Sequence, residues 1–146
     1  MKLKNVVTGT LVLTLLVLSG CEGGLGRGNP TTVAEQFMDL YYHKANFQEA
    51  KALATPAAAQ KIEEQFAASA GAVPGETGKS HEASYTLKEK DKLGNNNYYI
   101  YELTITTKEA GSLRKRVSLG IDWIDGAWRI TQFNESAASP PIRGAY

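Results

Sequence analysis

The sequence predicts an α+β domain in which about three N-terminal helices precede a four-stranded antiparallel sheet. Two patterns carry this prediction. Up to about residue 70, apolar residues recur every three or four positions, which is typical of amphipathic helices. From Ser84 onward apolar and polar residues alternate with a period of two, which is typical of strands, and turn-rich segments separate the stretches. A run of helices followed by a run of strands favours the α+β class.

The first helix is predicted to begin at a capping box formed by Thr32 and Glu35, with Pro30 just ahead of it. Asn46 is the expected stop. Between them one face carries an apolar stripe at offsets of three and four, formed by Val33, Phe37, Leu40, Tyr41 and Ala45.

Two further helices are expected before the first strand. The second is short and amphipathic, with Phe47, Ala50 and Leu53 on one face. Thr55-Pro56 opens the third, with the threonine as N-cap and the proline at the first helical position, where its missing N–H costs nothing. Residues 71–80 form a loop by composition. The inner face of the third helix is expected to hold Ala59, Ile62, Phe66 and Ala70.

The four strands are predicted over residues 84–89, 97–107, 113–123 and 127–133. Asp125-Gly126 lies between the last two strands and is a strong signal for a tight hairpin. We expect the basic cluster Arg114-Lys115-Arg116 to be a solvated strand edge. Alternation places two sets of residues on shared faces: Tyr99, Tyr101, Leu103 and Ile105 on one strand, and Leu113, Lys115, Val117, Leu119, Ile121 and Trp123 on the next.

Residues 1–20 have the organisation of a secretory signal rather than of a folded element. Lys2 and Lys4 precede an apolar run over residues 6–18, which is too short to span a bilayer core that needs about 20 residues. Small residues follow the run, and directly after them comes Cys21, the one cysteine in the chain.

The stretch Leu18-Ser19-Gly20-Cys21 resembles the lipobox of bacterial lipoproteins. The resemblance implies removal of residues 1–20, a thioether-linked diacylglycerol on Cys21, and acylation of the new amino terminus by a chain such as palmitate. The alternative is an ordinary cleaved signal with an incidental cysteine, although a lone exposed thiol is usually avoided in an oxidising compartment. Two or more acyl chains give stable anchoring, so we expect the protein to stay on a membrane of the cell envelope.

Glu22 follows the cysteine where an aspartate would resemble an inner-membrane retention signal in Gram-negative lipoproteins. In a Gram-negative cell, the expected location is therefore the outer membrane, facing the periplasm. Residues 21–30 are rich in glycine and are predicted to be a flexible tether, and residues 135–146 a flexible tail. The folded domain is then predicted over residues 31–134.

The charge of the mature chain gives no electrostatic reason to expect a nucleic-acid partner. Residues 1–20 contain two of the 16 lysines and arginines and none of the 15 acidic residues, so removing them leaves a formal charge of −1. Removing 20 of 146 residues leaves 126, a length suited to one domain without disulfides. The sequence does not indicate an oligomeric state.

Three segments also resemble small bacterial lipoproteins with a DUF4878-type domain of unknown function. They are the opening from Pro30 to Phe37, residues 46–50 ahead of Thr55-Pro56, and the closing residues 126–130. The resemblance covers about residues 29–134. It implies an NTF2-like, or cystatin-like, cone in which about three helices pack on a curved four-stranded sheet. It implies no characterised activity, so no catalytic residue is carried over from it.

The sequence carries no metal-ligand spacing typical of zinc, no phosphate-binding glycine loop and no nucleophile elbow. We therefore expect no cofactor, no metal and no catalytic residue. The enzyme alternative places Asp39, Tyr41, Tyr42 and His43 in acid/base chemistry at a cone pocket, as in proteins resembling ketosteroid isomerase. The competing interpretation is that Asp39 and His43 form a surface pair one helical turn apart.

The leading functional hypothesis is a non-enzymatic domain that binds a small apolar ligand or another envelope protein. Five aromatic residues could line an apolar pocket, although the same residues could simply be the helix-on-sheet core. A second surface, with Tyr98, Trp123 and Trp128, could be an aromatic patch for a protein partner. The five proposed pocket residues are Phe37, Tyr41, Phe66, Tyr99 and Tyr101.

Overall fold

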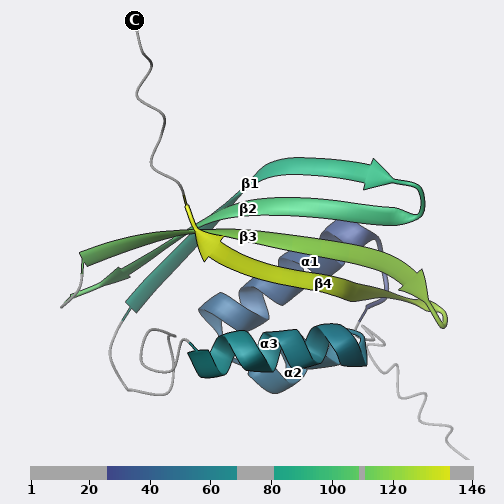
Figure 1. The fold of residues 1–146 in the computed structure, drawn as a ribbon, viewed down its shortest axis with the longest axis horizontal. Helices are drawn as coiled ribbons and strands as arrows, with labels where there is room; N and C mark the ends of the chain where they lie inside the picture. The colour runs from purple at the N-terminus through teal and green to yellow at the C-terminus, as the bar shows by residue number, and fades with distance from the viewer. Residues whose placement is uncertain (1–25, 69–80, 109–110, 139–146) are drawn as a thin grey trace, which may run out of the picture.

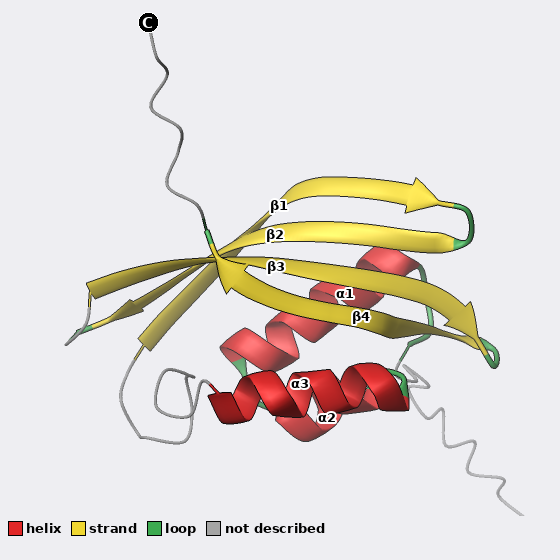
Figure 2. Ribbon diagram, viewed as in Figure 1, coloured by secondary structure: helices red, strands yellow, loops and turns green. Residues whose placement is uncertain are grey.

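The computed structural model describes residues 26–68, 81–108 and 111–138 (Figure 1). Its helices lie on one side of a curved antiparallel sheet whose strand order is β1-β2-β3-β4 (Figure 2). The predicted α+β class, with three helices and four strands, is confirmed. The elements are α1 (Pro30–Met38), a π-helical turn η1 (Asp39–His43), α2 (Phe47–Ala52), α3 (Pro56–Ala68), β1 (His81–Leu93), β2 (Asn96–Thr107), β3 (Gly111–Ile124) and β4 (Ala127–Ala137).

Helix α1 begins earlier than the predicted capping box. The side chain of Asn29 accepts a hydrogen bond from the Thr32 backbone N–H at 2.9 Å, and Pro30 occupies the first helical turn. The predicted cap at Thr32 and Glu35 is therefore wrong. Asparagine followed by proline is itself a strong start signal, because it supplies an N-cap acceptor and a pre-set backbone angle at the next position.

The helix widens at its end into the π-helical turn η1. The Lys44 backbone N–H donates to the Asp39 carbonyl, five residues earlier, at 2.9 Å, and Ala45 then takes a positive φ of 50°. This wider turn places three consecutive side chains, Leu40, Tyr41 and Tyr42, in the core. The helical segment ends at His43 with Lys44 as its C-cap, three residues before the predicted stop, and Asn46 instead caps α2 by accepting from the Glu49 N–H.

Helix α3 begins as predicted, with the Thr55 hydroxyl accepting from the Ala58 N–H at 3.4 Å. Its buried face contains Ala58 and Ile62, whereas Ala59 and Phe66 are half-buried. The buried alanine in the first turns of α3 is therefore Ala58, one residue before the predicted Ala59. Ala70 and the predicted loop at residues 71–80 lie outside the described residues.

The inner face of the sheet forms the core together with the helices. All four predicted residues of β2 are buried there, as are Val117, Leu119 and Ile121 of β3. Leu113 and Trp123 lie near the ends of β3 and are 46% and 55% exposed. The predicted hairpin at Asp125-Gly126 is present, with positive φ at both residues.

All four strands are longer than predicted, β1 and β4 by the most. β1 continues to Leu93, through residues 91–93 that the turn-rich composition had assigned to a turn. β4 continues to Ala137, so the first three residues of the predicted tail belong to the sheet, whereas residues 139–146 lie outside the described part. The basic cluster is not at a sheet edge, because β3 is an interior strand. Arg114 and Arg116 are exposed, but Lys115 points inward.

The outer edge of β4 is covered by two segments from the N-terminal part of the domain. Leu53 and Thr55 pair with Ile130 through two backbone hydrogen bonds of 2.9 Å. Earlier in the chain, the Gly26 carbonyl accepts from the Trp128 N–H, also at 2.9 Å. Such cover removes unpaired backbone groups from an edge strand.

Gly26 is buried, and residues 26–30 are part of the folded domain rather than of a flexible tether. Gly26 has a φ of +80°, and a Cβ there would lie 2.6 Å from the Trp128 carbonyl oxygen. The predicted tether at residues 21–30 is therefore too long at its C-terminal end.

Gly26→Ala is expected to lower the free energy of unfolding by about 2–3 kcal/mol, since it adds a backbone clash to an unfavourable φ. Gly94→Ala is the matched control, because Gly94 has a similar φ of +63° with open space around it. The control is expected to cost about 1 kcal/mol. Urea denaturation measures the free energy of unfolding of both variants. Faster hydrogen exchange at the Trp128 amide would show that its hydrogen bond to Gly26 has been lost. Equal costs for the two variants would contradict the close packing of Gly26.

Candidate functional site

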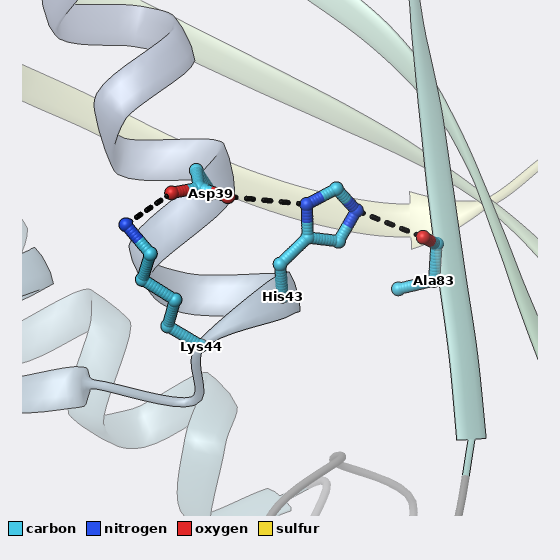
Figure 3. A network of polar contacts seen from close by, with 4 residues as sticks. All are labelled: Asp39, His43, Lys44 and Ala83. Atoms are coloured by element: carbon cyan, nitrogen blue, oxygen red, sulfur yellow. Dashed lines mark hydrogen bonds and ion pairs between the residues drawn. The ribbon is translucent and has the colours of Figure 1, made fainter.

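The polar cluster at the end of the first helical segment joins η1 to β1 (Figure 3). Asp39 accepts from both neighbours on its own segment, with His43 Nδ1 at 3.2 Å and Lys44 Nζ at 2.7 Å. His43 Nε2 lies 2.8 Å from the Ala83 carbonyl oxygen, and the imidazole stacks on the Tyr85 ring. Both ring nitrogens face oxygen acceptors, so only a doubly protonated imidazolium can donate both hydrogen bonds together.

The four residues of the enzyme alternative do not converge on one site. The Asp39 and His43 side chains are 36% and 40% exposed, whereas Tyr41 and Tyr42 are only 1% exposed and lie in the core. Burial raises the pKa of the Tyr41 hydroxyl, with a smaller contribution from the charge of Glu135. Acid/base chemistry requires its groups within hydrogen-bond reach of one another or of a shared substrate. Here the carboxylate and histidine form the surface pair of the competing interpretation.

The hydrogen bond from Lys44, offset by partial burial and aided by His43, holds the pKa of Asp39 below its usual value of 3.8. Because the folded-state pKa is lowered, the resulting stability is present above the unfolded pKa and is lost as pH falls through the folded one. The contribution to stability is small, since the pair is exposed and screened by solvent. We expect NMR titration to give an Asp39 midpoint below 3.8 that rises in Lys44→Met. An unchanged midpoint in that variant would contradict the role of Lys44.

Four of the five proposed pocket residues are almost completely buried, and Phe66 is half-buried. Tyr41 is central among them, with ring centroids 5.5 Å from Phe37, 5.2 Å from Phe47 and 5.4 Å from Phe133. Phe47 in turn contacts Phe66 at 4.1 Å. Such spacings are those of rings in direct contact. The structure therefore brings these side chains together as the packed interface between helices and sheet.

The two buried tyrosines on β2 differ in whether their hydroxyls have hydrogen-bond partners. Tyr99 Oη lies 3.1 Å from Thr31 Oγ1, within hydrogen-bond reach. Among the described residues, Tyr101 Oη has no hydrogen-bond partner, and burial raises the pKa of this hydroxyl. A buried hydroxyl without a partner is destabilising relative to an apolar group of the same shape.

A second polar cluster, absent from the sequence predictions, lies on the inner face of the sheet. Tyr42 donates to Glu135 Oε2 at 2.6 Å, and Lys115 Nζ forms an ion pair with Glu135 Oε1. The Lys115 and Glu135 side chains are only 15% and 11% exposed. Burial first, and the adjacent carboxylate second, raise the pKa of Tyr42 well above 10. The cluster joins η1, β3 and β4.

The predicted aromatic patch divides between the two faces of the sheet. Trp123 and Trp128 are cross-strand partners with ring centroids 5.2 Å apart, and Trp128 Nε1 donates to the Gly28 carbonyl. Tyr98 is half-buried, and its register places it on the opposite face from Ile121 and Trp123. Nearby, Leu93, Asn95, Asn96, Asp122, Trp123 and Ile124 line an open hollow of about 670 Å³.

Within the described ranges no three His, Cys, Asp or Glu side chains are grouped in a way that could hold a metal ion. None of the helices in this same part of the chain is long and apolar enough to cross a membrane. Cys21, the predicted lipidation site, lies outside the described residues.

No family model matches the sequence, and no curated protein matches it significantly. The fold, in contrast, is similar to that of solved protein structures. A designed NTF2-like protein aligns with a TM-score of 0.51 and 12% identity over 73% of this chain and 95% of its own. A calcium/calmodulin-dependent protein kinase type II association domain from Thiobacillus denitrificans aligns with a TM-score of 0.54 and 9% identity, over 74% of this chain and 94% of its own.

The chain has the NTF2-like fold. At these identities the likeness concerns the fold alone, and one fold hosts many unrelated functions. The resemblance to DUF4878-type lipoproteins implied helices packed on a curved four-stranded antiparallel sheet. This architecture is confirmed.

Proposed function

We propose that the protein is a bacterial lipoprotein of the cell envelope, anchored through lipid on Cys21 and carrying a DUF4878-type domain that binds rather than catalyses. The observation that carries this proposal is the lipobox-like Leu18-Ser19-Gly20-Cys21 after a charged and then apolar segment. The short distance along the chain suits this arrangement, because Gly26 is already fixed in the folded domain only five residues after the cysteine to be modified.

The packing of the domain favours a surface partner over an interior ligand. Phe37, Tyr41, Tyr99 and Tyr101 are each 0–1% exposed and take part in a continuous cluster with the helices. A small apolar ligand would have to displace these rings. The enzyme alternative gains no support from the geometry, since its carboxylate and histidine are at the surface and its tyrosines are buried.

Cys21→Ser is expected to abolish acylation and to prevent lipoprotein-type cleavage before residue 21, because the serine hydroxyl cannot form the thioether. The measurement is metabolic labelling with a radioactive fatty acid, followed by fractionation of the expressing cells. Ser19→Ala is the matched control, since it keeps a small residue two positions before the cysteine and should retain the label. Circular dichroism should show both variants folded. Retention of the label in Cys21→Ser would refute the proposal.

A further inference from the structure

The first described residue of the folded domain, Gly26, lies close in sequence to the proposed lipid on Cys21. Gly26 is held by its hydrogen bond to Trp128 and lies five residues after Cys21. Five residues span at most about 18 Å even when fully extended. If Cys21 carries acyl chains in a bilayer, the part of the domain around Gly26 is therefore within about 18 Å of the lipid headgroups.

Gly26 lies at one particular end of the domain. Its partner Trp128 stands at the start of β4, directly after the β3–β4 turn. In Figure 1 the start of α1, the β1–β2 turn and the β3–β4 turn all lie at this same end of the sheet. We call it the tether end and define it by Gly26, Leu93, Trp123, Ile124 and Trp128.

The tether end exposes large apolar side chains. Leu93 is 72% exposed and Trp123 is 55% exposed, and with Ile124 they border the open hollow. Leu93 and Trp123 lie beside neighbouring turns, near the ends of β1 and β3, and their registers place them on opposite faces of the sheet, because Leu93 pairs with Asn96 whereas Trp123 shares its face with Ile121. Tryptophan is enriched where a protein meets the membrane–water interface, because its ring is apolar and its N–H is polar.

The charges at the tether end are balanced. Arg27 and Lys92 are exposed there, and so are Asp91 and Asp125. This arrangement gives no net attraction to anionic lipids, so an interaction with the bilayer would depend on apolar and aromatic contact.

We propose that the tether end docks against the bilayer, with Trp123 and Leu93 at the depth of the phospholipid headgroups. The inference rests on the proposed lipidation of Cys21. The short connection from Cys21 to Gly26 makes docking intramolecular, so even weak apolar contacts are strongly populated. The domain then stands with its sheet end-on to the membrane and its opposite end, around Leu113, directed away. Leu113 and Trp123 are ten residues apart on β3, which is about 33 Å.

The test uses the acylated full-length protein, purified from expressing cells and reconstituted into phosphatidylcholine vesicles. Trp128→Phe leaves Trp123 as the single tryptophan, and the unmodified protein with both tryptophans serves if that variant does not fold. Vesicles made with lipids brominated near the headgroup are expected to quench Trp123 emission about twofold more than lipids brominated near the chain ends. The quenching should not depend on added anionic lipid.

Two substitutions locate the contact. Leu93→Ser at the tether end is expected to reduce the quenching, and Leu113→Ser at the opposite end is the matched control that should leave it unchanged. An acylated, vesicle-bound protein whose Trp123 emission is unquenched would overturn the docking while the proposed lipidation stands, and would leave this surface for a protein partner. An unacylated protein that stays in the supernatant would instead refute the proposed function.

Discussion

Glu135→Ala is expected to lower the free energy of unfolding by about 3–5 kcal/mol, because it leaves the Lys115 ammonium group unpaired in a mostly buried position. The Lys115 and Glu135 side chains are 15% and 11% exposed. The same substitution removes the acceptor of the Tyr42 hydroxyl, which then has to be satisfied by water in a crowded core. Both losses act at the junction of η1, β3 and β4, so they are expected to loosen the end of the sheet as a unit.

Chemical denaturation of Glu135→Ala and of a matched control measures this effect. The control is Glu102→Ala, which removes a carboxylate from the exposed Lys88–Glu102 pair on neighbouring strands and is expected to cost less than about 1 kcal/mol. The double substitution Lys115→Met with Glu135→Leu should recover much of the loss, because it removes both charges together. A Glu135→Ala cost no larger than that of Glu102→Ala would show that the pair is not effectively buried.

Phe37→Ala is expected to cost about 3–5 kcal/mol, because it deletes a fully buried ring from the centre of the helix–sheet interface. Phe37 stacks on Tyr41 and meets Phe133 edge-on at 5.3 Å. If these rings bordered an open pocket instead, truncation would enlarge a space that already existed and would cost much less. The prediction therefore distinguishes a filled cone from a ligand cavity.

Tyr101→Phe is the control for the same region, since it keeps the ring and removes only a hydroxyl without a partner among the described residues. It is expected to leave the stability unchanged or to raise it by about 1 kcal/mol. Thermal or urea unfolding measures both variants. A Phe37→Ala cost below about 1 kcal/mol, together with release of a bound apolar compound detected by mass spectrometry, would contradict the packed core.

Alternation predicted the buried face of β2 correctly because this strand is paired on both sides. Its residues Tyr99, Tyr101, Leu103 and Ile105 have no freedom to rotate away from a period of two. The start of α3 was also correct, since Thr55-Pro56 is a local signal that needs no distant partner. In both places the local sequence pattern agrees with the contacts that the folded domain makes, so the sequence was sufficient.

The errors occur where a distant residue decides the outcome. Glycine-rich composition indicated a flexible tether, but Gly26 is fixed by its contact with Trp128, about a hundred positions later. Lys115 was assigned to a solvated edge, and only the pairing of β3 with β4 brings it to Glu135. Lys115 lies two residues before Val117, so strand alternation places both on the same face. This was the one signal in the sequence that the lysine points inward. The π-helical turn is likewise set by packing, which draws three consecutive side chains into the core.

We propose that this NTF2-like domain is tethered to a membrane through lipid on Cys21. Intact-mass measurement of the protein extracted from expressing-cell membranes tests it most directly. We expect a chain that begins at Cys21 and carries the added mass of a diacylglycerol and a fatty acid on its first residue. A chain with an unmodified Cys21 thiol, whatever its first residue, would rule out the lipid anchor.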